Sequence, residues 1–381
     1  MKESQANKVI LLMSFLALVT RGKGISYQTR GQNSHILPYG QVSKIIQLKC
    51  GDVYDCIDVH LQPSLNHPQL KDHKIQMQPS SFPIGLDTEP QFLHSESQVQ
   101  PSIIDCPEGT VPVLRNNISG TSATHDIHVM GSMGIERAAA GIEYRGDVYG
   151  TTVKINVWQP KVNKDSKDVS ATWVHINNGV GEHTDRIGAG IMVNPSFSGD
   201  ISVRFHIAWT EGLEKKVCMD QSCRGFVQVS RKWAPGVRLD HVSVYDGPQW
   251  AMIIKIFKDP KTKNWWVTDG KNIPLGYWPN GLFTFLYDKG NFAFWGGIVQ
   301  GPTATSTAVE MGSGHFASEG YQRAAIIRKI QILNENNTYV TAEDDLKLAH
   351  GTSNSTLYTI DKFRVDTDGL GMYYGGPGLV A

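Results

Sequence analysis

The sequence has no surplus of charge of either sign. Its 381 residues hold 36 Lys and Arg against 36 Asp and Glu, so the formal net charge is zero. A chain without a basic excess is poorly suited to neutralise a phosphate backbone, which argues against nucleic acid as a partner. The shares of hydrophobic residues, 40%, and of charged residues, 19%, are those of an ordinary globular protein. The length suffices for one large domain and a smaller one.

Long apolar runs are lacking beyond the N-terminus. The stretch Val9–Val19 is apolar except for one serine; it follows a polar start with two lysines and precedes two small glycines. This pattern predicts a secretory signal peptide over residues 1–24. The alternative is a membrane anchor, but the run has only about half of the ~20 residues that span a bilayer. We therefore predict a secreted, extracellular protein with no membrane contact after signal removal.

Motifs for binding metal are also lacking. The five cysteines include no Cys-x-x-Cys pair, and the histidines show no zinc-site spacing. His125 and His128 are the nearest approach, but on a strand their side chains would face opposite sides. We predict neither a metal nor another cofactor.

The few cysteines would pair in an oxidising compartment. Cys218 and Cys223 are near enough in sequence to close a local loop, and at most one pair forms among Cys50, Cys56 and Cys106. One thiol is left over. Three triplets that suit N-glycosylation on a secreted chain begin at Asn117, Asn336 and Asn354.

The composition changes along the chain and suggests four regions. After the signal peptide, residues 42–77 form a compact segment that is too small to bury a useful core alone. Residues 78–124 are rich in polar residues and proline and indicate a linker and connecting segment. Residues 125–381 form the main domain.

The main domain shows repeated apolar and polar alternation, with a period of two residues. Turn residues separate the runs, which is typical of antiparallel sheets. We expect a hairpin turn at 259–264, a short helix starting at Pro68, and one further helix of one or two turns over 282–287. The absence of a long helical pattern predicts an all-β protein, an antiparallel β-sandwich resembling a jelly roll, preceded by a small pro-domain. The clearest alternating runs are 153–157, 201–207, 226–229, 252–257 and 330–332.

Five ordered blocks in the C-terminal half resemble one known family. They are Lys258-Asp259-Pro260 with Asn264-Trp265-Trp266, Gly276-Tyr277-Trp278-Pro279, Trp295-Gly296-Gly297, Met311-Gly312-Ser313-Gly314-His315-Phe316 and Tyr373-Tyr374-Gly375-Gly376-Pro377-Gly378. In this order they are similar to the neprosin family of plant secreted glutamic peptidases. The segments 55–58 and 67–77 resemble that family's activation peptide, and 106–112 resembles the part that follows it.

The resemblance implies a curved antiparallel β-sandwich with an active-site cleft. Members cleave peptide bonds beside proline at acidic pH and use no metal. Two glutamates face each other across the cleft: one carboxylate activates water and a protonated acid polarises the scissile bond. At the matching positions this chain has Gly188 and Ile298, neither of which can transfer a proton.

Nearby carboxylates are candidates for the two catalytic roles, and aromatic and histidine side chains are candidates for lining the cleft. Asp185, with Glu182 near it, precedes Gly188, and Glu310 precedes the Met311 block, so Asp185 and Glu310 are candidate substitute carboxylates. Aromatic and histidine side chains could line the cleft for a peptide or a sugar, although core packing is the alternative for them. The cleft candidates are Tyr277, Trp278, Trp295 and His315.

The resemblance also implies the disulfides Cys56–Cys106 and Cys218–Cys223, with Cys50 left over. Because the first of these would tie the pro-segment to the chain, we expect the pro-segment to remain over the cleft as a cover. The leading hypothesis is a catalytically degenerate peptidase that binds peptides. The alternatives are an acid-pH endopeptidase that uses substitute carboxylates, and a carbohydrate- or cell-wall-binding module.

Overall fold

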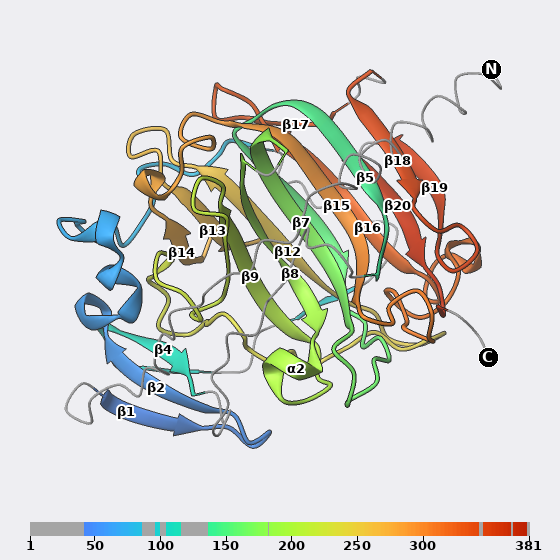
Figure 1. Ribbon diagram of the computed structural model, residues 1–381, viewed down its shortest axis with the longest axis horizontal. Helices are drawn as coiled ribbons and strands as arrows, with labels where there is room; N and C mark the ends of the chain where they lie inside the picture. Colours follow the sequence, from blue (N-terminus) through green and yellow to red (C-terminus); the bar gives the residue numbers. More distant parts are fainter. Residues whose placement is uncertain are drawn as a thin grey trace, which may run out of the picture.

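The computed structural model describes residues 42–85, 96–99, 104–115, 136–181, 183–342, 346–366 and 369–378. The predicted signal peptide, Asn117, His125, His128 and Glu182 therefore lie outside the described residues. Three β-sheets account for the fold, and the two large sheets lie one behind the other (Figure 1). The prediction of an all-β, mostly antiparallel sandwich is confirmed.

The first large sheet has seven strands, all paired antiparallel. Its order is β10 (Lys216–Met219), β9 (Arg204–Glu211), β8 (His183–Val193), β7 (Val169–Val180), β15 (Gly290–Gly301), β5 (Glu136–Val148) and β18 (Leu348–Thr352). The long strands β5, β7, β8 and β15 form its centre.

The second large sheet has ten strands. Its main path is β11 (Val227–Gln228), β14 (Pro274–Trp278), β13 (Trp265–Asp269), β12 (Trp250–Lys258), β6 (Gly150–Asn156), β16 (Ala325–Leu333), β20 (Gly369–Gly375) and β19 (Thr359–Asp366). Two short strands lie off this path: β17 (Tyr339–Val340) pairs with β16, and β3 (Ser97–Gln98) pairs in parallel with β12.

The small third sheet belongs to the N-terminal part. It contains β1 (Val42–Gln47), β2 (Val53–Asp58) and β4 (Thr110–Leu114), in that order. The described helices are one turn each: 3₁₀ helices at Val59–Leu61, Pro63–Asn66, Pro68–Leu70, Asn280–Leu282 and Ala317–Glu319, and the α-helix α2 at Pro195–Ser198.

Strand alternation fixes which side chains fill the sandwich. On β8, Ile187, Ala189 and Ile191 belong to the main core and are 0–2% exposed. Val174 and Ile176 of β7 join the same core. Because successive side chains of a strand point to opposite faces, the residues between them lie on the outer face, away from the second sheet.

The expected short helix at Pro68 and the expected hairpin turn at 259–264 are both present. The helix expected over 282–287 is wrong, because the only helical turn there is Asn280–Leu282. The buried Asp185 carboxylate accepts the backbone N–H groups of Phe285 and Leu286. Those donors are therefore held by a side chain and do not extend the helical turn.

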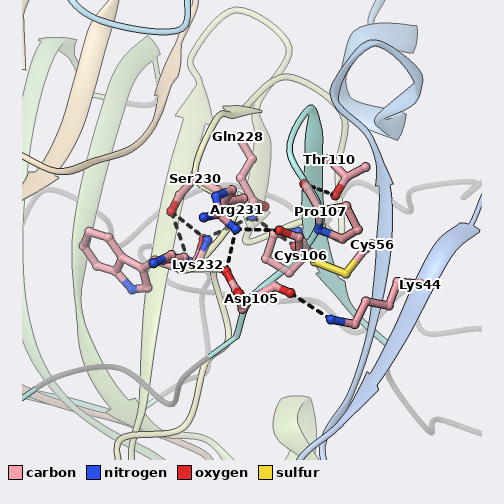
Figure 2. Close-up of a disulfide and its surroundings, with 12 residues drawn as sticks. Lys44, Cys56, Asp105, Cys106, Pro107, Thr110, Gln228, Ser230, Arg231 and Lys232 are labelled. Atoms are coloured by element: carbon pink, nitrogen blue, oxygen red, sulfur yellow. Dashed lines mark hydrogen bonds and ion pairs between the residues drawn. A yellow bond between two sulfur atoms is a disulfide. The ribbon is translucent and has the colours of Figure 1, made fainter.

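We call residues 42–85 and 104–115 the pro-unit. Strand β2 pairs with β1 on one side and β4 on the other, and the disulfide Cys56–Cys106 ties the two parts together. Figure 2 shows Arg231 of the main domain reaching the carboxylate of Asp105 and the carbonyl of Cys106. The second predicted disulfide, Cys218–Cys223, is also formed, and Cys50 is free and exposed.

The pro-unit docks on the edge of the ten-stranded sheet through a side-chain amide. Gln62 is 2% exposed; its Oε1 accepts the backbone N–H of Gln228 at 2.8 Å, and its Nε2 donates to the Gln228 carbonyl at 3.1 Å. The Gln228 side chain in turn donates to the Pro112 carbonyl at 3.0 Å. The edge strand β11 thus pairs with an amide in place of another strand.

The pro-unit also covers the outer face of β13 and β14. Tyr277 accepts the backbone N–H of Gln76 at 3.0 Å and contacts His73 Nε2 at 2.7 Å. Tyr277 stacks on Trp266, while Trp265 and Trp278, one residue along each strand, face inward. Both tryptophans of the Trp265-Trp266 pair are therefore fully buried, each on a different face.

The first prediction concerns cleavage of the connecting segment. A cut within residues 86–95 should leave residues 42–85 attached to the rest of the protein, because Cys56 remains joined to Cys106. Under denaturing conditions, intact-mass analysis should show one species without reductant and two fragments with it. A C56S/C106S variant is the control and should release the fragment in denaturant alone. Loss of the fragment from the wild-type protein without reductant would contradict the prediction.

Candidate functional site

The two positions singled out by the sequence, Gly188 and Ile298, lie on the same face of the seven-stranded sheet. Gly188 of β8 is opposite His175 of β7, which is opposite Phe294 of β15; Ile298 lies four residues further along β15. Both alternate with inward-facing core residues, so both belong to the outer face. The candidate site is therefore this outer face around β7, β8 and β15.

The space beside Gly188 is taken by a tryptophan. A Cβ atom built on Gly188 would lie 2.6 Å from Trp173 Nε1 and 2.8 Å from the Val174 carbonyl oxygen, which is too close for any side chain. The Trp173 ring extends over Gly190 as well, and the side chain is 2% exposed. A glutamate at position 188 would require this indole to move.

Ile298 lies in an apolar layer of its own. It is 6% exposed and is opposite Ala171 on β7 and Ala139 on β5. An ionised carboxylate here would lose its water without gaining a charge partner. The buried members of this layer are Ala171, Trp173, Met192, Ala208, Met219, Phe294 and Ile298.

The candidate substitute carboxylates have other partners. Asp185 is 1% exposed and lies on the core side of β8, whereas Arg186 and Gly188 face outward. Its carboxylate accepts three backbone N–H groups, from Gly212, Phe285 and Leu286. Glu310 accepts the backbone N–H of Lys161 at 2.8 Å and lies 3.2 Å from the Lys161 ammonium. The structure therefore does not bring Asp185 or Glu310 to the outer face beside Gly188.

The aromatic residues proposed for a cleft are not placed together. Tyr277, Trp278 and Trp295 are each 0% exposed, and Trp295 donates to the Thr151 hydroxyl at 2.9 Å. His315 is at a separate surface, stacked on Tyr245 at 4.4 Å and 3.1 Å from Glu319. Core packing, the alternative reading, holds for the first three residues, and none of the four lines the outer face around Gly188.

Charged residues that sequence reasoning did not single out lie on the outer face. Glu143 of β5 is opposite Phe294, in the same row as His175 and Gly188. Arg137 is also on β5, and Arg186 is two residues before Gly188; by strand alternation both point outward. The alternation could have placed each residue on a face, but the pairing of β5 with β15 brings together residues more than a hundred positions apart.

The electrostatics of this group follow from burial and from like charges. Burial raises the pKa of Glu143, although Arg145 lies 3.1 Å away and favours the ionised form. Burial, and then the charges of Arg186 and Arg137, hold the pKa of His175 well below its usual value. Burial and the charge of Arg137 lower the pKa of Arg186 to about 10. His175 is therefore neutral near pH 7, and both arginines remain charged.

Several polar atoms on this face have no hydrogen-bond partner. His175 is 4% exposed and stacks between Phe292 and Phe294, yet its Nδ1 is unpartnered. Asn177 Oδ1 and Arg186 Nε are unpartnered too. Buried polar atoms in folded proteins nearly always have a partner, so such a set indicates a place where a ligand or water completes the bonding.

One buried pair on this face already has a structural role. His206 of β9 is 1% exposed and its Nδ1 lies 2.6 Å from Asp220 Oδ2, while Asp220 Oδ1 accepts the Ile207 N–H. The Asp220 carboxylate thereby joins the start of the β10 turn to β9. Within the described ranges, no group of three or more His, Cys, Asp or Glu residues is arranged to hold a metal ion.

Two face-to-face sheets with a disulfide-tied N-terminal unit define a β-sandwich protein with a docked pro-segment. Residues 166–377, more than half of the chain, match the family model described as Neprosin, and residues 45–140 match the model described as Neprosin activation peptide. The chain belongs to the neprosin family and has a peptidase-like scaffold. Among solved structures, the crystal structure of Scytalido-glutamic peptidase with a peptide-based transition state analog is similar at 8% identity and a TM-score of 0.32, over 64% of this chain and 99% of that one.

Two of the three glycosylation triplets lie in described turns: Asn336 is exposed, and Asn354 is half-buried with its side chain bonded to Thr356. No helix among the described residues has the length and apolar character needed to cross a bilayer.

The described pro-unit does not act as the expected cover over Gly188. Its contacts lie along the edge and the outer face of the ten-stranded sheet and on β9 of the seven-stranded sheet, where Asp52 pairs with Arg204 at 2.8 Å. Three of its residues meet titratable groups of the main domain. His67 Nε2 lies 3.5 Å from Glu211, Ser80 donates twice to Asp259, and His73 meets Tyr277. Each contact uses an ionised carboxylate or a neutral histidine, so each depends on pH.

The pKa shifts determine how the stability of these contacts changes with pH. Burial alone would raise the pKa of Glu211 and of Asp259, but hydrogen bonds from His67 and from Ser80 outweigh it and leave both pKa values lowered. Their stabilisation is complete above the unfolded values of about 4 and is lost as pH falls through the folded ones. Burial lowers the pKa of His73, so stability also declines as pH falls below about 6.5.

The second prediction is that acidification loosens the pro-unit. Hydrogen exchange of residues 62–84, expressed relative to the intrinsic amide exchange rate at each pH, should be slowest above pH 6.5 and should quicken in two stages, one below about 6.5 and one below about 4.5. In a H73Q variant, the amide oxygen can still accept from Tyr277 but does not titrate, so the upper stage should disappear. Exchange that is unchanged between neutral and acidic pH would contradict the assignment of these contacts.

The third prediction concerns the apolar layer. I298E should lower the free energy of unfolding by about 2 kcal/mol or more at pH 7, and by less at pH 4, where the new carboxyl is largely protonated in the unfolded chain too. I298V should cost about 1 kcal/mol at both pH values. Denaturant unfolding measures both variants. An I298E variant as stable as the wild type at pH 7 would show that this position is open to water.

Proposed function

We propose that this neprosin-family protein is a secreted, catalytically degenerate peptidase scaffold that binds peptides on the outer face of its seven-stranded sheet without cleaving them. One observation carries the proposal: both positions of the family's catalytic glutamates are occupied by residues without a titratable group, inside a buried apolar layer. General acid–base groups contribute about 10²–10⁴-fold each, and groups that act together fail together.

The packing around these positions supports the proposal that the protein lacks peptidase activity. Trp173 lies where a side chain at 188 would begin, and Ile298 has small apolar neighbours on both flanking strands. A glutamate substituted at position 188 would therefore clash with Trp173. A glutamate at position 298 would be buried among apolar side chains without water. Catalysis tolerates misplacement of only about 1 Å, so neither position is poised to regain its role.

Peptide binding is supported by the unpartnered polar atoms on the same face. An extended peptide offers alternating N–H donors and carbonyl acceptors. Asn177 Oδ1 lacks a donor and Arg186 Nε lacks an acceptor, and the two residues are directly opposite each other on β7 and β8. Both atoms are buried, so a bound peptide backbone would satisfy them once the two side chains rotate outward.

The active-enzyme alternative depends on Glu143, since Asp185 and Glu310 are held elsewhere. Glu143 has a raised pKa and lies in the Gly188 row, but Arg145 is bound to it and Phe294 stands between it and His175. It is one carboxylate where the family's chemistry uses two. The glycan-binding alternative has weaker support, because Tyr277, Trp278 and Trp295, its aromatic candidates, are fully buried.

The fourth prediction tests the proposal directly. The purified protein, incubated with a proline-rich peptide between about pH 3 and 6, should give no cleavage products by mass spectrometry while still binding the peptide in a fluorescence anisotropy assay. E143Q and E310Q variants serve as matched controls. Turnover by the wild type that disappears in either variant would establish a working peptidase and overturn the proposal.

A further inference from the structure

The outer face of the seven-stranded sheet carries an excess of positive charge around Gly188. Three guanidinium groups, from Arg137, Arg145 and Arg186, face one carboxylate, Glu143. That carboxylate is already in an ion pair with Arg145 at 3.1 Å. Neither Arg137 nor Arg186 forms an ion pair with any carboxylate of the described ranges. Glu143 also attracts the charge of Arg137, so within this part of the chain one carboxylate offsets only one of three guanidinium charges.

These two arginines interact unfavourably with each other. The charge of Arg137 lowers the pKa of Arg186, and both charges lower the pKa of His175. Holding like charges together on a partly buried surface destabilises the folded protein unless something else offsets the cost. An anion bound between them would turn repulsion into attraction.

The site also has a place and a donor for such an anion. Arg186 lines a small hollow, about large enough for one water molecule or one carboxylate oxygen, together with Trp173, Gly188, Ala208, Trp209, Thr210 and Val217. Gly188 contributes no side chain to it. Beside it on β7, His175 presents a buried Nδ1 without a partner. Neutral imidazole can place its proton on either nitrogen, so Nδ1 can donate to an oxygen.

We propose that this face binds the carboxylate of an acidic peptide, with Arg186 and Arg137 as its charge partners and the hollow beside Gly188 as its seat. The inference rests on the proposed function and adds the chemical class of the ligand. Where the family places a carboxylate of the protein, this chain accepts one from its partner. Arginine suits the role because its planar guanidinium bonds a carboxylate through two parallel N–H groups.

Phosphate-rich polymers are disfavoured as the occupant. The whole chain has no net charge, and the cationic group consists of only a few arginines beside the apolar layer of Trp173, Phe294 and Ile298. Such a surface matches a peptide whose acidic groups alternate with apolar ones. The carboxylate itself can come from a Glu or Asp side chain or from the C-terminus of a peptide.

The experiment uses the full-length protein and three fluorescently labelled peptides. The first alternates proline and glutamate and has an amidated C-terminus, the second replaces each glutamate by glutamine, and the third is the glutamine peptide with a free C-terminal carboxylate. The first peptide should bind about tenfold tighter than the second, since a hydrogen bond to a charged group has that effect on affinity. Its affinity should fall as salt is added.

Variants assign the effect to the two arginines. R137Q should weaken binding of the glutamate peptide about tenfold while leaving the glutamine peptide unaffected. R186Q should weaken the glutamate peptide about tenfold more than the glutamine peptide, because Arg186 also contacts the peptide backbone, and R186K should retain part of the preference. R323Q is the matched control, because Arg323 is an exposed arginine paired with Asp246 in the loop before β16 of the opposite sheet. Thermal melting checks each fold; Arg137 is exposed, so R137Q keeps the test valid if R186Q unfolds.

The outcomes separate this inference from the proposed function. Equal binding of all three peptides overturns the carboxylate site while peptide binding stands. No binding of any peptide overturns both. A loss in R323Q equal to that in R186Q also overturns the site. Tight binding by the third peptide alone supports the site and assigns it to a C-terminal carboxylate, whereas tight binding by the first assigns it to side chains.

Discussion

The face-to-face packing of the two large sheets is the constraint on which the rest of the molecule depends. It fixes Ile187, Ala189, Val174 and Ile176 in the shared core. With a period of two residues, it also fixes which residues of β7, β8 and β15 face outward. Gly188 and Ile298 face outward for this reason alone, whatever chemistry they support. The scaffold can therefore keep its stability while the outer face changes its residues.

The outer face around Gly188 and Ile298 is a closely packed surface. Trp173 covers two glycines, and Ile298 joins an apolar layer that a pair of ionised carboxylates would not tolerate. On the same face, His175, Asn177 and Arg186 each have a polar atom without a hydrogen-bond partner. Beside this apolar layer Glu143 lies with the arginines of the face, so the face combines a packed floor with an excess of positive charge.

Much of the fold could be predicted from the sequence, because strand alternation and turn residues are local signals. The hairpin at 259–264 and the helix at Pro68 are of this kind. The helix expected over 282–287 was wrong because its backbone donors go to Asp185, about a hundred residues away. The candidate site divides in the same way: Gly188 and Ile298 were found by resemblance, but Glu143 and Arg137 reach that site only through the pairing of β5 with β15. The burial of Tyr277 likewise depends on the pro-unit, which no local pattern around Tyr277 reports.

The pairing of Gln62 with Gln228 has a consequence for the behaviour of the protein in solution. Strand β11 ends the ten-stranded sheet, and the amide of Gln62 occupies the donor and the acceptor that another chain would need to extend it. A form stripped of its N-terminal part would expose this edge together with Trp266 and Tyr277. The pro-unit therefore blocks the strand edge at which a second chain could add to the sheet.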